Sequence, residues 1–169
     1  MTPIAREPAE ILLIDNDAVA RAGATAVLES AGHVVHQAEN RTVALKLART
    51  EALDLMICDV NLDGQGGLDL CRDLRRMPGM EDVPVMFVSS SQLPDIIRRS
   101  HDAGGAYYLR KPLDPEVLLD LVSKALWLPH LVQSRLAMHE PASQPVPPPR
   151  KKAAITRASA IQGIRMPLA

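Results

Sequence analysis

Residues 54–59 read Asp-Leu-Met-Ile-Cys-Asp, a short apolar run that ends at the carboxylate of Asp59. An uninterrupted apolar run of this length is typical of a strand that is covered on both faces, as the strands of parallel sheets are. Two more such runs lie at Ile11–Ile14, which Asp15 follows, and at Val85–Val88, which serines follow. The sequence therefore predicts three buried strands, each with polar residues directly after it.

Longer amphipathic stretches separate these runs, with apolar side chains at the spacing of one helix face. With two further short strands, five strands alternate with five helices. This alternation predicts an α/β fold: a doubly wound, five-stranded parallel sheet of flavodoxin-like order 2-1-3-4-5, with helices on both faces. The expected strands are 11–14, 33–37, 54–58, 85–88 and 106–110, and the expected helices are 17–30, 40–48, 68–77, 93–102 and 116–128.

The chain has 169 residues, of which 47% are hydrophobic, enough for one well-buried core but not for two ordinary domains. We expect an N-terminal extension over residues 1–9 and a single domain over 10–128. Pro129 is expected to interrupt the last helix, and residues 129–140 could form a helical extension. Residues 141–169 are rich in proline, which predicts a disordered basic tail. No fused DNA-binding domain is expected.

Charge is divided unevenly along the chain. Five bases and one acid follow His139, and removing them from totals of 19 and 20 leaves 14 bases and 19 acids in residues 1–139. An acidic body argues against binding to duplex nucleic acid, and an aromatic content of 2% argues against binding to single strands. The two cysteines lack metal-ligand spacing, and no apolar run approaches the roughly 18 residues that cross a bilayer. We therefore expect a cytoplasmic protein without a membrane span.

Polar side chains follow four of the five expected strands, and the carboxyl ends of parallel strands meet at one edge of a sheet. Oxygen ligands and a lysine ammonium would make a site there that suits Mg²⁺ and a phosphoryl group. Clustered carboxylates repel each other and so favour a bound cation. The residues are Asp15, Asn16 and Asp17 after the first strand, Asp59 after the third, Ser89 and Ser90 after the fourth, and Lys111 after the fifth. Asp17 has a second interpretation, as the cap of the following helix.

Four motifs in this order resemble those of the response-regulator receiver family, and the resemblance covers Ile11 to about Leu128. Each motif alone is a weak signal, whereas four in the right order are a strong one. They are Ile14–Asp17, with Arg21 at the usual spacing; Leu55–Leu62, which contains Asp59, with Gly67 where the family keeps a glycine; Pro84–Ser90; and Ala103–Pro112, which contains Lys111.

The resemblance implies a phosphoacceptor of a two-component phosphorelay. Asp59 would accept a phosphoryl group from a histidine kinase or phosphotransfer protein, and the domain would at most catalyse its own phosphorylation and dephosphorylation. Asp15, Asp59 and the backbone carbonyl of Asn61 would hold Mg²⁺. Asn16 stands where the family has an acid, and as a neutral ligand it is expected to weaken Mg²⁺ binding. Asp17 or Asp63 could partly substitute for that acid.

The resemblance also implies a switch and a surface for partners. Ser89, Ser90 and Lys111 would bind the phosphoryl oxygens, and Ser89 would move inward so that Tyr108 can turn. The downstream partner would be an unidentified protein, and phosphorylation could favour a homodimer. The expected partner face carries Arg98, Arg99, Tyr107 and Tyr108.

Two alternatives remain open from the sequence. Because of Asn16, the chain could be a pseudo-receiver that binds proteins without being phosphorylated. Ile14–Val19 also resembles the first motif of haloacid-dehalogenase-like phosphohydrolases, in which Asp15 would be the nucleophile. That alternative leaves Asp59 without a role. The phosphohydrolase family also requires a further acidic pair after a later strand, whereas one helix and a Pro-rich tail are all that is expected after Lys111.

Overall fold

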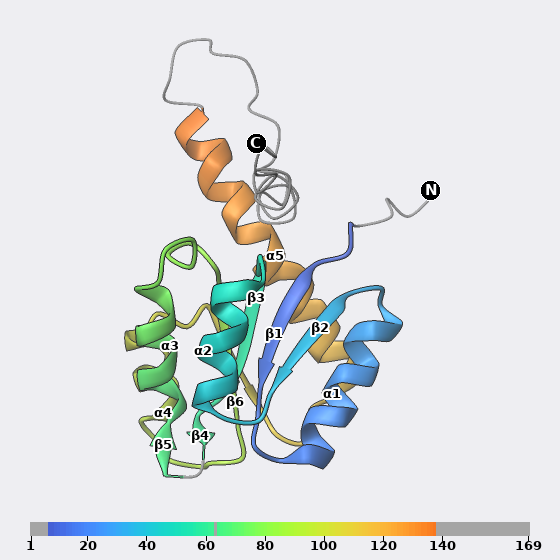
Figure 1. Cartoon of the computed structure of the whole chain (residues 1–169), viewed down its shortest axis with the longest axis vertical. Coiled ribbons are helices and arrows are strands. Elements are labelled where there is room, and N and C mark those ends of the chain that lie inside the picture. Colours follow the sequence, from blue (N-terminus) through green and yellow to red (C-terminus); the bar gives the residue numbers. More distant parts are fainter. Residues whose placement is uncertain (1–6, 63, 138–169) are drawn as a thin grey trace, which may run out of the picture.

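The structure is a computed structural model, and it describes residues 7–62 and 64–137. At its centre lies a parallel five-stranded sheet in the order β2-β1-β3-β6-β7 (Figure 1). Counted along the chain, these strands have the order 2-1-3-4-5, so the predicted doubly wound fold is confirmed. The strands are β1 (Glu10–Ile14), β2 (Val34–Ala38), β3 (Leu55–Asp59), β6 (Val85–Ser89) and β7 (Tyr107–Arg110).

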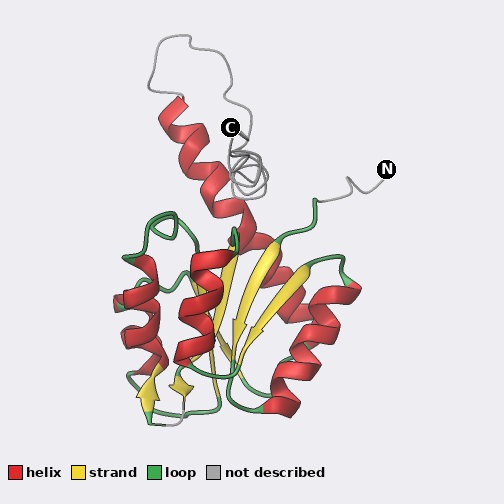
Figure 2. Ribbon diagram, viewed as in Figure 1, coloured by secondary structure: helices red, strands yellow, loops and turns green. Residues whose placement is uncertain are grey.

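Helices cover both faces of the sheet (Figure 2). The sheet separates two apolar cores, one on each face. Successive strand residues alternate between these cores, as the pleat requires: Leu12 and Ile14 pack under α2, α3 and α4, whereas Ile11 and Leu13 pack under α1 and α5. Burial on both faces explains why the central strands are continuously apolar. The helices are α1 (Ala18–Ser30), α2 (Arg41–Thr50), α3 (Gly67–Arg75), α4 (Ile96–Asp102) and α5 (Pro115–Ala137).

Short polar side chains start three of these helices. The Asp17 carboxylate accepts hydrogen bonds from the backbone N–H groups of Val19 and Ala20, at 2.9 and 3.1 Å, and so caps α1. These two bonds hold the pKa of Asp17 below its ordinary value. Asn40 caps α2 and Asp114 caps α5 in the same way. The capping interpretation of Asp17 is therefore confirmed.

The segment after β3 contains two short strands that are not among the expected ones. Residues Asn61–Leu62 (β4) and Gln65–Gly66 (β5) pair as a short antiparallel hairpin. The two residues between them read Asp-Gly, the dipeptide typical of a two-residue hairpin turn, and Gly64 has the positive φ of 75° that such turns require. That signal was available in the sequence, and the hairpin brings Asn61 and Gly66 side by side.

The last helix is longer than expected. Helix α5 runs without a break from Pro115 to Ala137, so the interruption predicted at Pro129 does not occur. A proline removes one backbone hydrogen bond, which a long helix can lose without ending there. The remainder of the predicted extension (138–140), the predicted tail (141–169) and residues 1–6 lie outside the described residues. In the part of the chain that the structure covers, no helix combines the length and apolar character needed to cross a membrane.

Gly67, the first residue of α3, touches the strand that carries Asp59. A Cβ at this position would lie 1.8 Å from the Asp59 carbonyl oxygen, and the Gly67 N–H donates a 2.8 Å hydrogen bond to the Val60 carbonyl. Only a residue without a side chain allows this close approach of helix and strand.

We expect Gly67→Ala to lower the free energy of unfolding by about 3 kcal/mol, because the methyl group must displace backbone. Gly23→Ala is the matched control: Gly23 lies in α1 with open space around it, so the same change should raise stability by about 0.5–1 kcal/mol through helix propensity. Urea unfolding of both variants measures the difference. Equal effects of the two changes would contradict the packing argument.

Candidate functional site

The carboxyl edge of the sheet brings together four residues from four strand ends. Asp15 follows β1, Asp59 is the last residue of β3, Ser89 is the last residue of β6, and Lys111 follows β7. Asp15, Asp59 and Ser89 are buried, with 3%, 5% and 0% of their surface exposed. Buried polar groups at the end of a parallel sheet are unusual unless they pair with one another.

Lys111 pairs with both carboxylates. Its Nζ lies 2.6 Å from Oδ2 of Asp15 and 2.6 Å from Oδ2 of Asp59, and only 15% of the lysine side chain is exposed. Burial alone lowers the pKa of Lys111, but the two hydrogen bonds outweigh it, and the net effect is a pKa above the ordinary value. The ammonium therefore keeps its charge at neutral pH, while two carboxylates share this one cation.

The remaining carboxylate oxygens are held by the backbone. Oδ1 of Asp15 accepts from the N–H of Asp17 at 2.9 Å, and Oδ1 of Asp59 accepts from the N–H of Asn61 at 2.8 Å. Arg21, which the sequence motif named without a role, fixes the backbone here: its guanidinium donates a 2.6 Å hydrogen bond to the Asp15 carbonyl. Each carboxylate thus has one oxygen fixed by the main chain and one turned to Lys111.

The serine and asparagine residues take different positions around this pair. The Ser89 hydroxyl accepts a 2.9 Å hydrogen bond from the N–H of Ser91, and the Ser89 carbonyl accepts from the N–H of Lys111, also at 2.9 Å. Ser90 is exposed beside it, and Asn16 is partly buried next to Asp15. Asp63 lies outside the described residues.

The two tyrosines of β7 leave the sheet on opposite faces. Tyr107 packs against the core under α1 and α5, whereas Tyr108 packs against the core under α2, α3 and α4. The Tyr108 hydroxyl is buried and has no hydrogen-bond partner among the described residues. Arg98 and Arg99 are exposed on α4. Because β7 is the edge strand of the sheet, these two tyrosines flank that edge, and the partner face expected from α4 and β7 stays a prediction.

Few oxygen atoms at the carboxyl edge of the sheet are suited to bind a hard cation such as Mg²⁺. No group of three or more His, Cys, Asp or Glu side chains in residues 7–62 and 64–137 is arranged to hold a metal ion. The carboxylates of Asp15 and Asp59 converge on one cation, and Asn61 follows two residues after Asp59 with its carbonyl as a further oxygen donor. These three donors match the preferences of Mg²⁺, which usually binds through one or two carboxylates and retains water.

Comparison with known proteins identifies the fold that carries this site. The family model described as "Response regulator receiver domain" matches residues 11–123, two thirds of the chain. The chain belongs to the response-regulator receiver family. This places it among the signalling modules of two-component systems rather than among enzymes. The match includes Asp59, which the phosphohydrolase alternative left without a role.

The receiver domain resembles curated proteins of very different lengths. Protein PilH of Pseudomonas aeruginosa is 31% identical over 118 residues, which cover 70% of this chain and 98% of PilH. The gliding motility regulatory protein of Myxococcus xanthus is 32% identical over 127 residues, but this alignment spans 72% of this chain and only 16% of that protein. Receiver domains thus occur here both as most of a protein and as a small part of one.

Solved structures show the same fold. A putative response regulator from Chloroflexus aurantiacus superposes with a TM-score of 0.67 at 29% identity, covering 71% of this chain and 98% of that one. The chemotaxis protein CheY4 of Vibrio cholerae superposes with a TM-score of 0.66 at 24% identity, over 70% and 98% of the two chains. The second likeness supports the fold alone.

We expect Lys111→Met to lower the free energy of unfolding of the receiver domain by about 3 kcal/mol, because two buried carboxylates lose the ammonium with which both form ion pairs. Since folding raises the pKa of Lys111, its contribution is complete below the ordinary value of 10.5 and is lost only as the pH rises above the folded pKa. The measurement is urea unfolding at neutral pH without divalent cations.

Lys124→Met provides the matched control, because Lys124 pairs with Asp120 at 2.6 Å on the exposed surface of α5. Exposed pairs contribute little, so this change should leave stability almost unaltered. Adding Asp59→Asn to Lys111→Met should recover most of the loss by removing one of the repelling charges. A loss no larger than that of Lys124→Met would show that Lys111 does not neutralise the pair.

Proposed function

We propose that this receiver domain accepts a phosphoryl group on Asp59 from the phosphohistidine of a histidine kinase or phosphotransfer protein. The observation that carries the proposal is the buried cluster of Asp15, Asp59 and Lys111 at the carboxyl edge of the sheet. A lone buried carboxylate would be a poor acceptor for an anionic group, whereas a carboxylate beside a fixed ammonium is a charge-compensated nucleophile. A relative named as a sensor histidine kinase, AruS of Pseudomonas aeruginosa, is 39% identical over 106 residues, consistent with such a system.

In the proposed transfer, an Asp59 carboxylate oxygen attacks the phosphorus atom while the bond from phosphorus to the donor imidazole nitrogen breaks. The nitrogen leaves with the electron pair, and Asp59 becomes an acyl phosphate. Lys111 then has two roles. It fixes Oδ2 of Asp59 before transfer, and it pairs with the phosphoryl oxygens afterwards as the charge at this position increases.

Asp15, Asp59 and the Asn61 carbonyl would hold Mg²⁺ at this edge. When bound, Mg²⁺ would supply positive charge to the phosphoryl oxygens in transfer. Asp17 contributes its carboxylate to the cap of α1, so it offers little compensation for Asn16. We therefore propose weak Mg²⁺ binding as a property of this chain.

The response to phosphorylation would pass through Ser89 and Tyr108. The Ser89 hydroxyl is held by the N–H of Ser91, a bond that it would have to give up in order to reach a phosphoryl oxygen on Asp59. The Tyr108 hydroxyl is buried without a partner in the part of the chain that the structure describes, which makes the present position of this side chain costly. That cost would help Tyr108 to move to a second position. The charge added at Asp59 by phosphorylation could thus shift Ser89 and Tyr108 from one arrangement to another.

A second candidate function rests on Asn16. If the neutral amide leaves Mg²⁺ binding too weak for transfer, the domain acts as a protein-binding module that is not phosphorylated. Under that alternative, Asp59→Asn should leave binding to a partner unchanged, whereas phosphorylation-regulated binding should lose its regulation in the same variant.

Intact-mass measurement after incubation with acetyl phosphate and Mg²⁺ tests the primary proposal. Wild type should gain about 80 Da, the mass of one phosphoryl group, and Asp59→Asn should gain nothing. Asn16→Asp should reach half-maximal phosphorylation at roughly tenfold lower Mg²⁺, because a charged ligand replaces a neutral one. Asp120→Asn, which removes an exposed carboxylate of α5, should behave as wild type.

Two results would count against phosphorylation of the natural protein. A mass gain that persists in Asp59→Asn would place the acceptor elsewhere. No gain in wild type at high Mg²⁺, together with a gain in Asn16→Asp, would establish an intact fold whose natural sequence signals by binding alone.

A further inference from the structure

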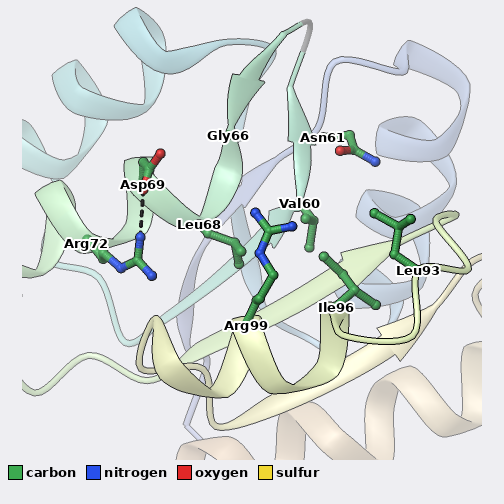
Figure 3. Close-up of a pocket in the computed structure, with 9 residues that line it drawn as sticks. All are labelled: Val60, Asn61, Gly66, Leu68, Asp69, Arg72, Leu93, Ile96 and Arg99. Carbon is green, nitrogen blue, oxygen red and sulfur yellow. Dashed lines mark hydrogen bonds and ion pairs between the residues drawn. The ribbon is translucent and has the colours of Figure 1, made fainter.

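A cavity of about 130 Å³ opens between the β4–β5 hairpin, α3 and α4, beside the phosphorylation site (Figure 3). It exists because the segment after β3 forms a hairpin, whose two strands supply one wall while α4 supplies the opposite one. The residues that line it are Val60, Asn61, Gly66, Leu68, Asp69, Arg72, Leu93, Ile96 and Arg99.

The floor of the cavity is apolar. Val60, Leu68 and Ile96 are buried side chains of the core, and each exposes about 5% or less of its surface. Leu93 lies at the mouth with 54% of its surface exposed, which is high for a large apolar residue. The floor and Leu93 at the mouth therefore favour an apolar side chain as occupant.

The rim is basic. Arg72 forms an ion pair with Asp69 at 2.6 Å, whereas the guanidinium of Arg99 has no ion pair among the described residues. Figure 3 shows Arg99 rising from α4 across the opening, with Val60, Leu68 and Ile96 around it. Two cations and one acid give the cavity a net positive charge. An arginine that lies over an apolar floor is well placed to bind a carboxylate.

We propose that this cavity is the docking site for an acidic segment of a partner protein, which inserts one aliphatic or aromatic side chain between its carboxylates. The volume supports a single side chain, because a cavity of about 150 Å³ holds benzene whereas drug-sized ligands need about 300 Å³ or more. The chain's own residues 141–169 are poor occupants, since they carry five bases and no acid.

This surface differs from the partner face expected from the family resemblance. Arg99 lines the cavity, but Arg98, Tyr107 and Tyr108 do not. Docking here would use the side of α4 that faces the hairpin and α3. Of the four residues of the expected face, Arg99 alone also lines the cavity.

The wall of the cavity is bonded to the proposed phosphoacceptor. Asn61 donates its N–H to Oδ1 of Asp59, and Val60 donates its N–H to the carbonyl of Val88 in β6. A change at Asp59 would therefore alter the wall, and occupancy of the cavity would in return alter Asp59. This linkage rests on the proposed function, whereas docking itself does not.

The test is titration of ¹⁵N-labelled full-length protein with a peptide in which a phenylalanine is flanked by two glutamates on each side, followed by NMR. Amide shifts should cluster at Gly66, Leu68, Asp69 and Arg99. The same peptide with lysines in place of glutamates, or with alanine in place of phenylalanine, should bind at least about tenfold more weakly. Equal binding of the lysine peptide, or shifts clustered away from the cavity, would overturn the proposal.

Two matched pairs of exposed residues on α4 and the segment before it locate the site. Arg99→Glu should weaken binding by about tenfold or more, whereas Arg98→Glu, the same charge change one residue away, should change it less than about twofold. Leu93→Ala should weaken binding by about threefold or more, and Ile97→Ala, which removes another exposed apolar side chain outside the cavity, should not. Equal losses within either pair would overturn the assignment.

Two further measurements distinguish docking of an acidic partner from self-association, and docking itself from its linkage to Asp59. Concentration-dependent dimerisation that Arg99→Glu abolishes, without peptide binding, would assign the cavity to a second copy and overturn the acidic partner. Repeating the titration on protein shown by intact mass to be phosphorylated tests the linkage. An affinity unchanged in phosphorylated protein would overturn the linkage alone, and an absent mass gain would count against the proposed function instead.

Discussion

One ammonium shared by two buried carboxylates is the interaction on which the functional edge of this protein depends. Asp15 and Asp59 end adjacent strands, so the parallel sheet itself forces them together, and like charges in a buried position are stable only with a counter-charge. Lys111 supplies that charge from the end of β7, two strands away from β3. The same arrangement that stabilises the fold holds the Asp59 carboxylate next to a cation, as the proposed acceptance of a phosphoryl group requires.

The surrounding backbone turns this electrostatic requirement into a defined geometry. Both carboxylates have one oxygen fixed by a main-chain N–H two residues later, and the glycine at position 67 lets α3 approach the carbonyl of Asp59. In this chain a glycine and two tight turns thus hold Asp15 and Asp59 in place, so that stability and the proposed function depend on the same positions. Asn16 stands where the receiver family has an acid, yet the fold is intact. The difference would therefore affect the proposed Mg²⁺ binding rather than the architecture.

The hairpin after β3 extends the influence of Asp59 beyond the carboxyl edge. Its first strand begins two residues after Asp59, and its second strand ends where α3 starts, so the acceptor, the hairpin and the cavity share one short stretch of chain. A site for phosphoryl transfer and a site for a partner side chain would then be neighbours that exchange free energy through backbone hydrogen bonds. In a domain of this size, one short segment of chain would then connect the proposed phosphorylation site to the proposed docking cavity.

The sequence by itself determined the five strands of the main sheet, their order, the starts of the helices and the set of polar residues at the strand ends. These features depend on local spacing and on the rule that parallel strands end at one edge, and both can be read from residues such as Asp17, Asn40 and the run that ends at Asp59. Only the tertiary structure decided that Lys111 bridges both carboxylates and that the Tyr108 hydroxyl is buried without a hydrogen-bond partner among the described residues. It also decided that α5 continues through Pro129 and that Arg99 lies over a cavity. Each of these depends on contacts between residues far apart in the chain or on the packing around a helix, and periodicity carries no information about such contacts.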